Sequence, residues 1–138
     1  MGLSLLKSLD QRGTGSLTSI DMPFWGTQYE NQIGCVIPKK LHSKWRLIRL
    51  PDRDALPKIL KSAKPFDMCH YDSDKSYDGK IWALPRIWNR INEDGLIICD
   101  DISDNLAFKD FCEKYSLNPI IVKTYDSQVE KYVGIVVK

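Results

Sequence analysis

The stretch from Gly95 to Ile102 constrains the fold more than any other part of the chain. Four apolar residues in a row, Leu96–Cys99, predict a short strand that is buried on both faces. Two carboxylates, Asp100 and Asp101, follow at its carboxyl end. Ligands of open α/β sheets bind beyond the carboxyl ends of the strands, so this pair is the first candidate for a functional site. The alternative is that Asp101 only caps the next turn.

Length, charge and cysteine content limit the kind of protein that this chain can be. A chain of 138 residues predicts one domain, and 43% hydrophobic with 28% charged residues is ordinary for a globular protein. A net charge of +2 without a dense Lys/Arg stripe does not indicate a nucleic-acid partner. No apolar run approaches the roughly 18 residues of a membrane span. The four cysteines form no CxxC pair, which favours a reducing, cytoplasmic location over disulfides or a zinc site.

Strand and helix patterns alternate along the chain. Strands are predicted at 17–20, 45–50, 66–71 and 96–99, and helices are marked by apolar residues within 3–9, 55–63, 81–91 and 108–115. Pro85 is expected to kink or split its helix. The linker between two last strands, 120–122 and 132–137, is too short for a crossover helix and predicts an antiparallel pair. The pattern predicts an α/β, Rossmann-like three-layer sandwich with a mostly parallel sheet that ends in an antiparallel hairpin.

The stretch 22–44 is the least regular part of the chain. It contains Trp25, Tyr29 and three lysines near its end. A segment of this length without periodicity is often a functional loop or lid. An ordinary surface excursion with a short helix explains it equally well.

Carboxylates follow three of the predicted strands, at Asp21, at Asp72 and at the Asp100–Asp101 pair. Mg²⁺ or Ca²⁺ prefers oxygen ligands, so Asp72 with Asp100 or Asp101 could hold one such ion from adjacent strands. Asp72 could instead be a general base or a helix cap. Asp21 suits a different role, because a carboxylate at a strand end can accept hydrogen bonds from ribose hydroxyls. His70 is expected to be a core histidine within its strand.

The segments Phe66 to Tyr77, Trp82 to Trp88 and Asp94 to Ile102 together resemble the class I S-adenosylmethionine-dependent methyltransferases. The resemblance is to the branch of small-molecule O-methyltransferase-like proteins that carry an H-D-S-x-H-S-Y motif. The segments from Ser19 to Pro23, whose acid in that branch binds the cofactor ribose, and from Gly34 to Leu47 also resemble it.

Two departures from the family pattern affect the expected site. The first strand and the glycine-rich loop of the family, E-x-G-x-x-x-G, are missing, so the resemblance implies an N-terminally truncated domain. Tyr71 and Lys75 stand where the family motif has histidines, whereas Asp72, Ser73, Ser76 and Tyr77 are kept. A protonated Lys75 cannot be a metal ligand or a base. In the family's strand order, the missing strand leaves a vacancy between the strand that ends at Asp21 and the strand that precedes Asp72.

The resemblance implies an enzyme that transfers a methyl group from S-adenosylmethionine to a small-molecule acceptor. Asp21 and Asp72 would bind the cofactor, and Asp72, Lys75 and Tyr77 would be the catalytic residues. Asp72, Asp100 and Asp101 would hold an optional Mg²⁺ or Ca²⁺ ion. Activity and cofactor affinity are expected to be impaired in this chain alone. A non-catalytic remnant or interaction module, a fragment of a longer reading frame and a homo-oligomer remain open alternatives.

Overall fold

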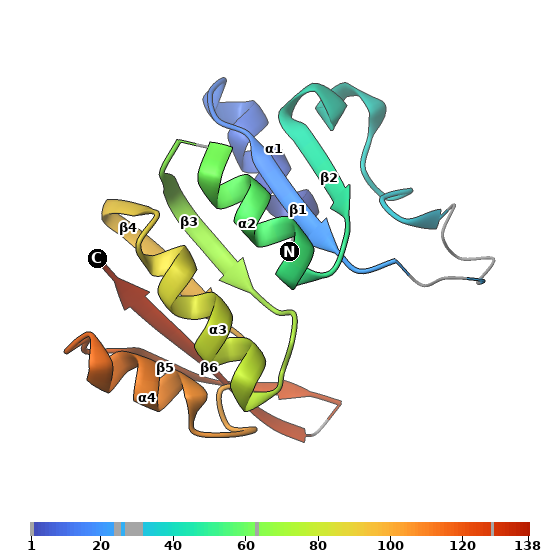
Figure 1. Cartoon of the computed structure of the whole chain (residues 1–138). Coiled ribbons are helices and arrows are strands. Elements are labelled where there is room, and N and C mark those ends of the chain that lie inside the picture. Colours follow the sequence, from blue (N-terminus) through green and yellow to red (C-terminus); the bar gives the residue numbers. More distant parts are fainter. Residues whose placement is uncertain (1, 24–25, 27–31, 63, 128) are drawn as a thin grey trace. The chain divides into compact units, whose positions relative to one another are not determined.

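The computed structural model describes residues 2–23, 26, 32–62, 64–127 and 129–138. The chain divides into two compact units, Met1–Ala55 and Leu56–Lys138. Each unit has its own sheet (Figure 1). Trp25 and Tyr29 of the irregular stretch lie outside the described residues. No helix of the described residues is long and apolar enough to span a membrane.

The first unit is built on two parallel strands. Its elements are α1 (Gly2–Arg12), β1 (Leu17–Asp21), the 3-10 helix η2 (Lys39–Lys44) and β2 (Trp45–Arg49). The strands pair in register from Leu17 opposite Trp45 to Asp21 opposite Arg49. Leu6 of α1 and Leu41 of η2 are fully buried in this unit, so a helix and a 3-10 turn supply its small core. This parallel pairing confirms the expectation for the two strands.

The second unit contains a four-stranded mixed sheet in the order β3-β4-β6-β5. The strand pair β3–β4 is parallel, whereas β4–β6 and β5–β6 are antiparallel, as predicted. The elements of this part of the chain are α2 (Asp52–Ser62), β3 (Phe66–Tyr71), α3 (Tyr77–Trp88), β4 (Ile91–Cys99), α4 (Ala107–Lys114), β5 (Ile120–Asp126) and β6 (Val129–Val137).

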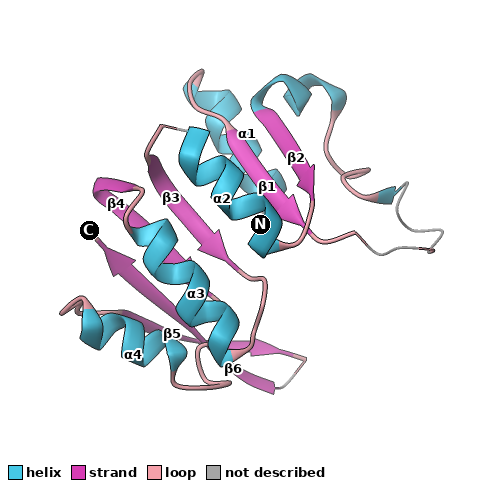
Figure 2. Ribbon diagram, viewed as in Figure 1, coloured by secondary structure: helices cyan, strands magenta, loops and turns pink. Residues whose placement is uncertain are grey.

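One face of this sheet packs against helices α3 and α4, which lie side by side in front of it in Figure 2. Ile97 and Cys99 of β4 and their neighbour Val136 of β6 are buried on this face. Gly134 of β6 lets α4 approach closely, because a Cβ atom at this position would lie 2.3 Å from the ring of Phe108. The tight packing fixes the carboxyl end of β4, where the predicted site begins.

The structure corrects two expectations about the elements. Pro85 does not split its helix, because α3 runs from Tyr77 to Trp88 and Pro85 lies in its last turn. The other outcome that was expected, a kink at Pro85, stays a prediction. Ile91 was expected on the helix face, but it begins β4, which is five residues longer at its start than predicted. Asp94 has a φ of 64° within β4, close to a shift in the register between β3 and β4.

The predicted single sheet is divided in the structure. β1 and β3 each form the end of a separate sheet, and no pairing joins them among the described residues. The mixed α/β composition with parallel and antiparallel strands is confirmed. The single domain, the three-layer arrangement and the vacancy beside β1 remain predictions.

Candidate functional site

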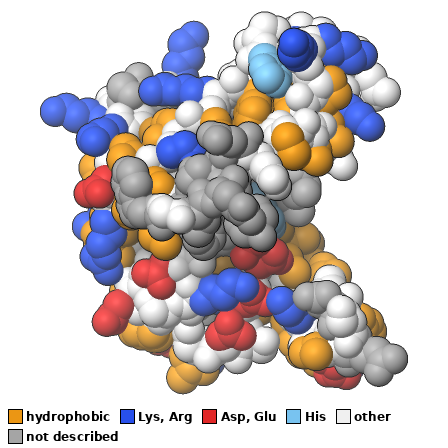
Figure 3. All heavy atoms as spheres, turned by 90° about the vertical axis from the view of Figure 1, so that its right-hand side faces the viewer, with side chains coloured by type: hydrophobic (Ala, Val, Ile, Leu, Met, Phe, Trp, Pro, Cys, Tyr) orange, Lys and Arg blue, Asp and Glu red, His pale blue; other side chains and the backbone are white. Residues whose placement is uncertain are grey.

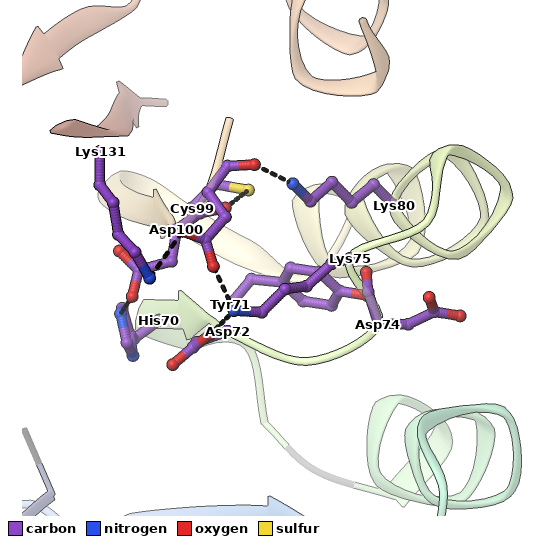
Figure 4. A network of polar contacts seen from close by, with 10 residues as sticks. His70, Tyr71, Asp72, Asp74, Lys75, Lys80, Cys99, Asp100 and Lys131 are labelled. Atoms are coloured by element: carbon purple, nitrogen blue, oxygen red, sulfur yellow. Dashed lines mark hydrogen bonds and ion pairs between the residues drawn. The ribbon is translucent and has the colours of Figure 1, made fainter. Parts of the chain in front are cut away.

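The carboxyl ends of β3 and β4 bring together most of the predicted site residues of the second unit (Figure 4). Asp72 directly follows β3, and Asp100 and Asp101 directly follow β4. The backbone N–H of Asp100 donates to the carbonyl oxygen of Tyr71 at 3.0 Å, which continues the parallel ladder one residue past the strand. The pairing therefore holds the carboxyl ends of β3 and β4 at a fixed distance from each other.

Asp100 and Asp101 have different surroundings although they are adjacent. Oδ2 of Asp100 lies 3.4 Å from Nε2 of His70. His70 and Asp100 lie on one face of the sheet, because His70 is in register with Ile98, two residues before Asp100. Nε2 of His70 is buried and has no hydrogen-bond partner among the described residues. His70 is thus half-buried against a carboxylate rather than enclosed by apolar side chains.

The carboxylate of Asp101 is paired with two lysines. Lys75, in the loop after β3, donates a hydrogen bond to Oδ2 of Asp101. Lys131 of β6 places its Nζ 3.4 Å from Oδ1. Lys75 Nζ also lies 3.9 Å from Oδ1 of Asp72. On the face of the molecule that Figure 3 shows, acidic and basic side chains lie next to one another in the lower half of the view.

The ion pair between Lys75 and Asp101 shifts the pKa of both side chains. The hydrogen bond from Lys75 lowers the pKa of Asp101, and desolvation of the carboxylate opposes this effect. The same hydrogen bond raises the pKa of Lys75, against the smaller opposing effect of desolvation. Both groups are therefore charged at neutral pH, and Lys75 carries a proton that prevents it from acting as a base.

A third lysine approaches Asp101 from inside the fold. Lys80 of α3 is 1% exposed, and its ammonium group donates to the backbone oxygen of Asp101. Asp101 has a φ of 48°, a left-handed conformation that residues with a side chain rarely adopt. The strain of such a backbone persists only where surrounding contacts determine it, and the three lysines supply such contacts.

The loop that carries Lys75 is ordered by its own hydrogen bonds. Oδ1 of Asp74 accepts from the backbone N–H of Ser76, and Oγ of Ser76 accepts from the N–H of Gly79 and caps α3. A Cβ atom at Gly79 would lie 2.2 Å from the carboxylate carbon of Asp74, so a glycine is needed for this close approach. Asn105 donates from Nδ2 to the backbone oxygen of Lys75 at 2.8 Å.

Tyr77 is held by a different contact. Its hydroxyl donates to Oδ2 of Asp110 on α4 at 2.8 Å, and this hydrogen bond raises the pKa of Tyr77. The contact ties the first turn of α3 to α4. The structure thus brings Asp72, Lys75 and Asp101 together, and it engages Tyr77 with a neighbouring helix.

The residue predicted to hold the cofactor ribose, Asp21, lies in the first unit at the carboxyl end of β1. Arg49, in register with it at the end of β2, donates from Nη1 to Oδ2 of Asp21. The side chain of Asp21 is nevertheless 44% exposed. A partly exposed carboxylate at a strand end is suited to accept hydrogen bonds from hydroxyl groups.

The residues predicted to bind a divalent cation are not arranged as a ligand set. No group of three His, Cys, Asp or Glu side chains within the described ranges is placed to hold a metal ion. Mg²⁺ and Ca²⁺ need several oxygen ligands at roughly 2.0–2.6 Å. Both carboxylate oxygens of Asp101 are paired with lysines, Lys75 and Lys131, and the carboxylate of Asp100 lies near His70. The prediction that Asp72, Asp100 and Asp101 hold Mg²⁺ or Ca²⁺ is therefore not supported.

A comparison with known protein families gives a match over most of the chain. A family model described as a methyltransferase domain matches residues 2–102, which is more than half of the 138 residues. The chain belongs to this methyltransferase family. A comparison of the methyltransferase domain with curated proteins gave no match.

Solved structures share the fold of this methyltransferase domain. An O-methyltransferase from Bacillus cereus in complex with SAH is 15% identical with a TM-score of 0.64, over 90% of this chain and 63% of that chain. The O-methyltransferase TomG from Streptomyces achromogenes in complex with SAM is 12% identical with a TM-score of 0.59, over 99% and 78%. Precorrin-6y C5,15-methyltransferase from Geobacter metallireducens is 11% identical with a TM-score of 0.65, over 97% and 73%. The domain thus has a class I O-methyltransferase-like fold, and it spans less than two thirds of the Bacillus cereus protein.

The sequence interpretation missed Lys80, Lys131, Asn105 and Arg49. Lys80 carried a detectable signal, because it lies on the same helical face as Leu84 and Ile87, both of which are buried. A lysine on an apolar stripe of this kind indicates a buried ammonium group with a specific partner. Lys131, Asn105 and Arg49 carried no comparable signal, since their partners are distant in the sequence.

Proposed function

We propose that this methyltransferase domain takes part in methyl transfer from S-adenosylmethionine to an oxygen atom of a small-molecule acceptor. The observation that carries the proposal is Asp21, a partly exposed carboxylate at the carboxyl end of the parallel strand β1. It stands where an acid can accept hydrogen bonds from the two ribose hydroxyls. The Bacillus cereus and TomG structures, which contain SAH and SAM, support the choice of cofactor.

The acidic end of the β3–β4 pair is the proposed location of the acceptor. Methyl transfer is an in-line displacement at the sulfonium methyl group, and positioning supplies much of its acceleration. Asp72 would orient the acceptor hydroxyl and take its proton as the O–C bond forms and the S–C bond breaks, with SAH as the leaving group. The Lys75 ammonium would hydrogen-bond the acceptor oxygen. Tyr77, engaged with Asp110, would position the loop that carries Lys75.

The proposal includes finer expectations about the whole domain. It assigns the two sheets to one Rossmann-like, three-layer domain and expects a cytoplasmic location. The four cysteines of the sequence form no CxxC pair, a pattern that favours a reducing compartment. It also expects impaired cofactor affinity, because the chain contains no E-x-G-x-x-x-G segment to bring backbone close to the cofactor.

One observation favours a second function, a methyltransferase-like module that binds no cofactor. Arg49 donates to Asp21, the carboxylate that the ribose would need. Charge-assisted hydrogen bonds of this kind contribute about 1.5–3 kcal/mol, so the ribose must compete with the guanidinium group. The two functions therefore differ in whether Asp21 accepts from a ligand.

The deciding experiment is an NMR titration of the ¹⁵N-labelled chain with SAH. Loss of several backbone contacts, at about 4 kcal/mol, predicts a dissociation constant near 1 mM for a normally micromolar ligand. Amide signals of β1 and β2 should shift, and Asp21→Asn should weaken binding about tenfold or more. Asp10→Asn, which removes an exposed carboxylate 4.0 Å from Lys40, is the matched control.

Absence of SAH binding at 5–10 times that concentration, about 5–10 mM, would favour the module without cofactor. Arg49→Met then separates two causes. If Arg49 blocks the ribose, the Arg49→Met variant should bind SAH more tightly than the unaltered chain. If the variant gains no SAH affinity, Asp21 has no role in cofactor recognition. Micromolar binding by the unaltered chain would contradict the expected impairment and favour full catalytic function.

A further inference from the structure

Asp101 accepts from three ammonium groups that come from three separate elements. Lys75 in the loop after β3 contacts Oδ2, Lys131 of β6 contacts Oδ1, and Lys80 of α3 contacts the backbone oxygen. Figure 4 shows these lysines converging on the end of β4 from different directions. The Asp101 residue is only 8% exposed, so its oxygen atoms have little access to water.

This arrangement opposes the binding of a divalent cation. Each carboxylate oxygen of Asp101 already faces one ammonium group. A dication on the same oxygens would lie within about 4–5 Å of both ammonium groups, a distance at which like charges repel strongly in a partly desolvated site. Asp100, the adjacent candidate ligand, is oriented toward His70 instead.

We propose that Lys75 and Lys131 take the place of a divalent cation at the end of β4, so that this site operates without a metal ion. The side chains of Lys75 and Lys131 are 52% and 37% exposed, and each ammonium group has three N–H donors. The pair therefore offers donors to an anionic or partly anionic oxygen of an acceptor, at a place where a metal would offer open coordination positions. The part that concerns the acceptor rests on the proposed function, whereas the exclusion of metal does not.

Mn²⁺ is the probe for this proposal, because it binds oxygen ligands and its paramagnetism reports binding by water-proton relaxation or EPR. The unaltered chain is expected to show no saturable Mn²⁺ site with a dissociation constant below about 1 mM. A Lys75→Met/Lys131→Met double variant should bind Mn²⁺ about tenfold more tightly or better, and the addition of Asp101→Asn should abolish this gain. Lys123→Met, which removes a lysine paired with Glu130 on the same hairpin, is the matched control.

Two results would overturn the proposal. The first is submillimolar Mn²⁺ binding by the unaltered chain that Asp101→Asn abolishes. The second is a folded double variant that gains no Mn²⁺ affinity, because the lysines would then not be what keeps the cation away. The first measurement needs no variant of the lysines. If the double variant does not fold, Lys131→Met alone can replace it, and its gain in Mn²⁺ affinity should be about half of the double variant's gain on a logarithmic scale. SAH binding is measured separately, from the amide signals of β1 and β2. The Mn²⁺ results therefore keep their meaning even if the chain does not bind SAH.

Discussion

The ammonium group of Lys80 lies inside the folded chain and donates a hydrogen bond to the backbone oxygen of Asp101. The contact joins the first turn of α3 to the second residue after β4, twenty-one positions later. It also holds the left-handed backbone of Asp101, whose φ is 48°. Lys80 is therefore a structural support for the site, although it is not exposed to any ligand.

Substitution of Lys80 should lower the free energy of unfolding in proportion to what is lost. Lys80→Ala leaves a cavity and an unpaired carbonyl oxygen, and should cost about 3 kcal/mol. Lys80→Met refills most of the space and should cost about 1–2 kcal/mol for the lost hydrogen bond. Urea unfolding followed by tryptophan fluorescence measures both. Lys61→Met, at an exposed lysine of α2, is the control, and a stabilised Lys80→Met variant would mean that burial of the charge outweighs the hydrogen bond.

Asn105 should contribute to stability from both ends of its amide. Nδ2 donates to the backbone oxygen of Lys75, and Oδ1 accepts from the N–H of Ala107 at the start of α4. Asn105→Ala removes the hydrogen bond to the first residue of α4 together with the hydrogen bond to the loop, and should lower the free energy of unfolding by about 1–2 kcal/mol. Hydrogen exchange should quicken in the loop 72–76 and in the first turn of α4. Asn118→Ala, at an exposed asparagine before β5, should change stability by less than about 0.5 kcal/mol, and equal effects of the two variants would contradict the assigned role.

The cysteines should differ sharply in their reactivity with iodoacetamide. Burial raises the pKa of Cys99 to about 12 and that of Cys112 to about 11. At pH 8 the reactive thiolate is then about one part in ten thousand at Cys99 and about one in a thousand at Cys112. Mass spectrometry of the native chain should find Cys35, which is exposed, modified first. Cys99 and Cys112 should react only after unfolding in urea, and equal labelling rates in the native chain would show that the packing of α4 on the sheet is open.

The buried strand and the acidic residues after it could be predicted because their signals are local. Leu96–Cys99 is a continuous apolar run, and β4 indeed occupies the centre of its sheet between β3 and β6. The antiparallel pairing of β5 and β6 also followed from the chain alone, since a short linker permits no crossover. Sequence reasoning succeeds where neighbours in the chain determine the structure.

The contacts that determine the chemistry of the site could not be predicted in this way. Lys131 reaches Asp101 from a strand thirty positions later, and Asn105 reaches Lys75 across the same separation. Strand spacing placed Asp100 and Asp101 together, but the left-handed backbone of Asp101 and the orientation of Asp100 toward His70 gave them different surroundings. A set of metal ligands inferred from residue type alone therefore overlooked the ammonium groups of Lys75 and Lys131, which pair with Asp101.

The pairing of Asp101 with Lys75 should make stability depend on pH in the acidic range. The hydrogen bond from Lys75 lowers the pKa of Asp101 below its ordinary value of 3.8. A carboxyl group with a lowered pKa in the folded state stabilises that state above its unfolded pKa, and this stabilisation is lost as the pH falls through the folded value. The free energy of unfolding of the unaltered chain should therefore differ from that of Asp101→Asn by a constant amount between about pH 5 and pH 7. This difference should shrink below about pH 4.

Urea unfolding at a series of pH values measures this difference, and Glu93→Gln, at an exposed carboxylate of β4, controls for the loss of one negative charge. Lys75→Met should behave in the opposite sense at alkaline pH. The pKa of Lys75 is raised above 10.5, so its contribution is present below that pH and is lost as the pH rises through the folded value. If the Asp101→Asn difference stayed constant down to pH 2.5, about one unit below the ordinary pKa of an aspartate, the Lys75–Asp101 ion pair would not form in solution. Lys75 would then not take the place of a divalent cation at Asp101.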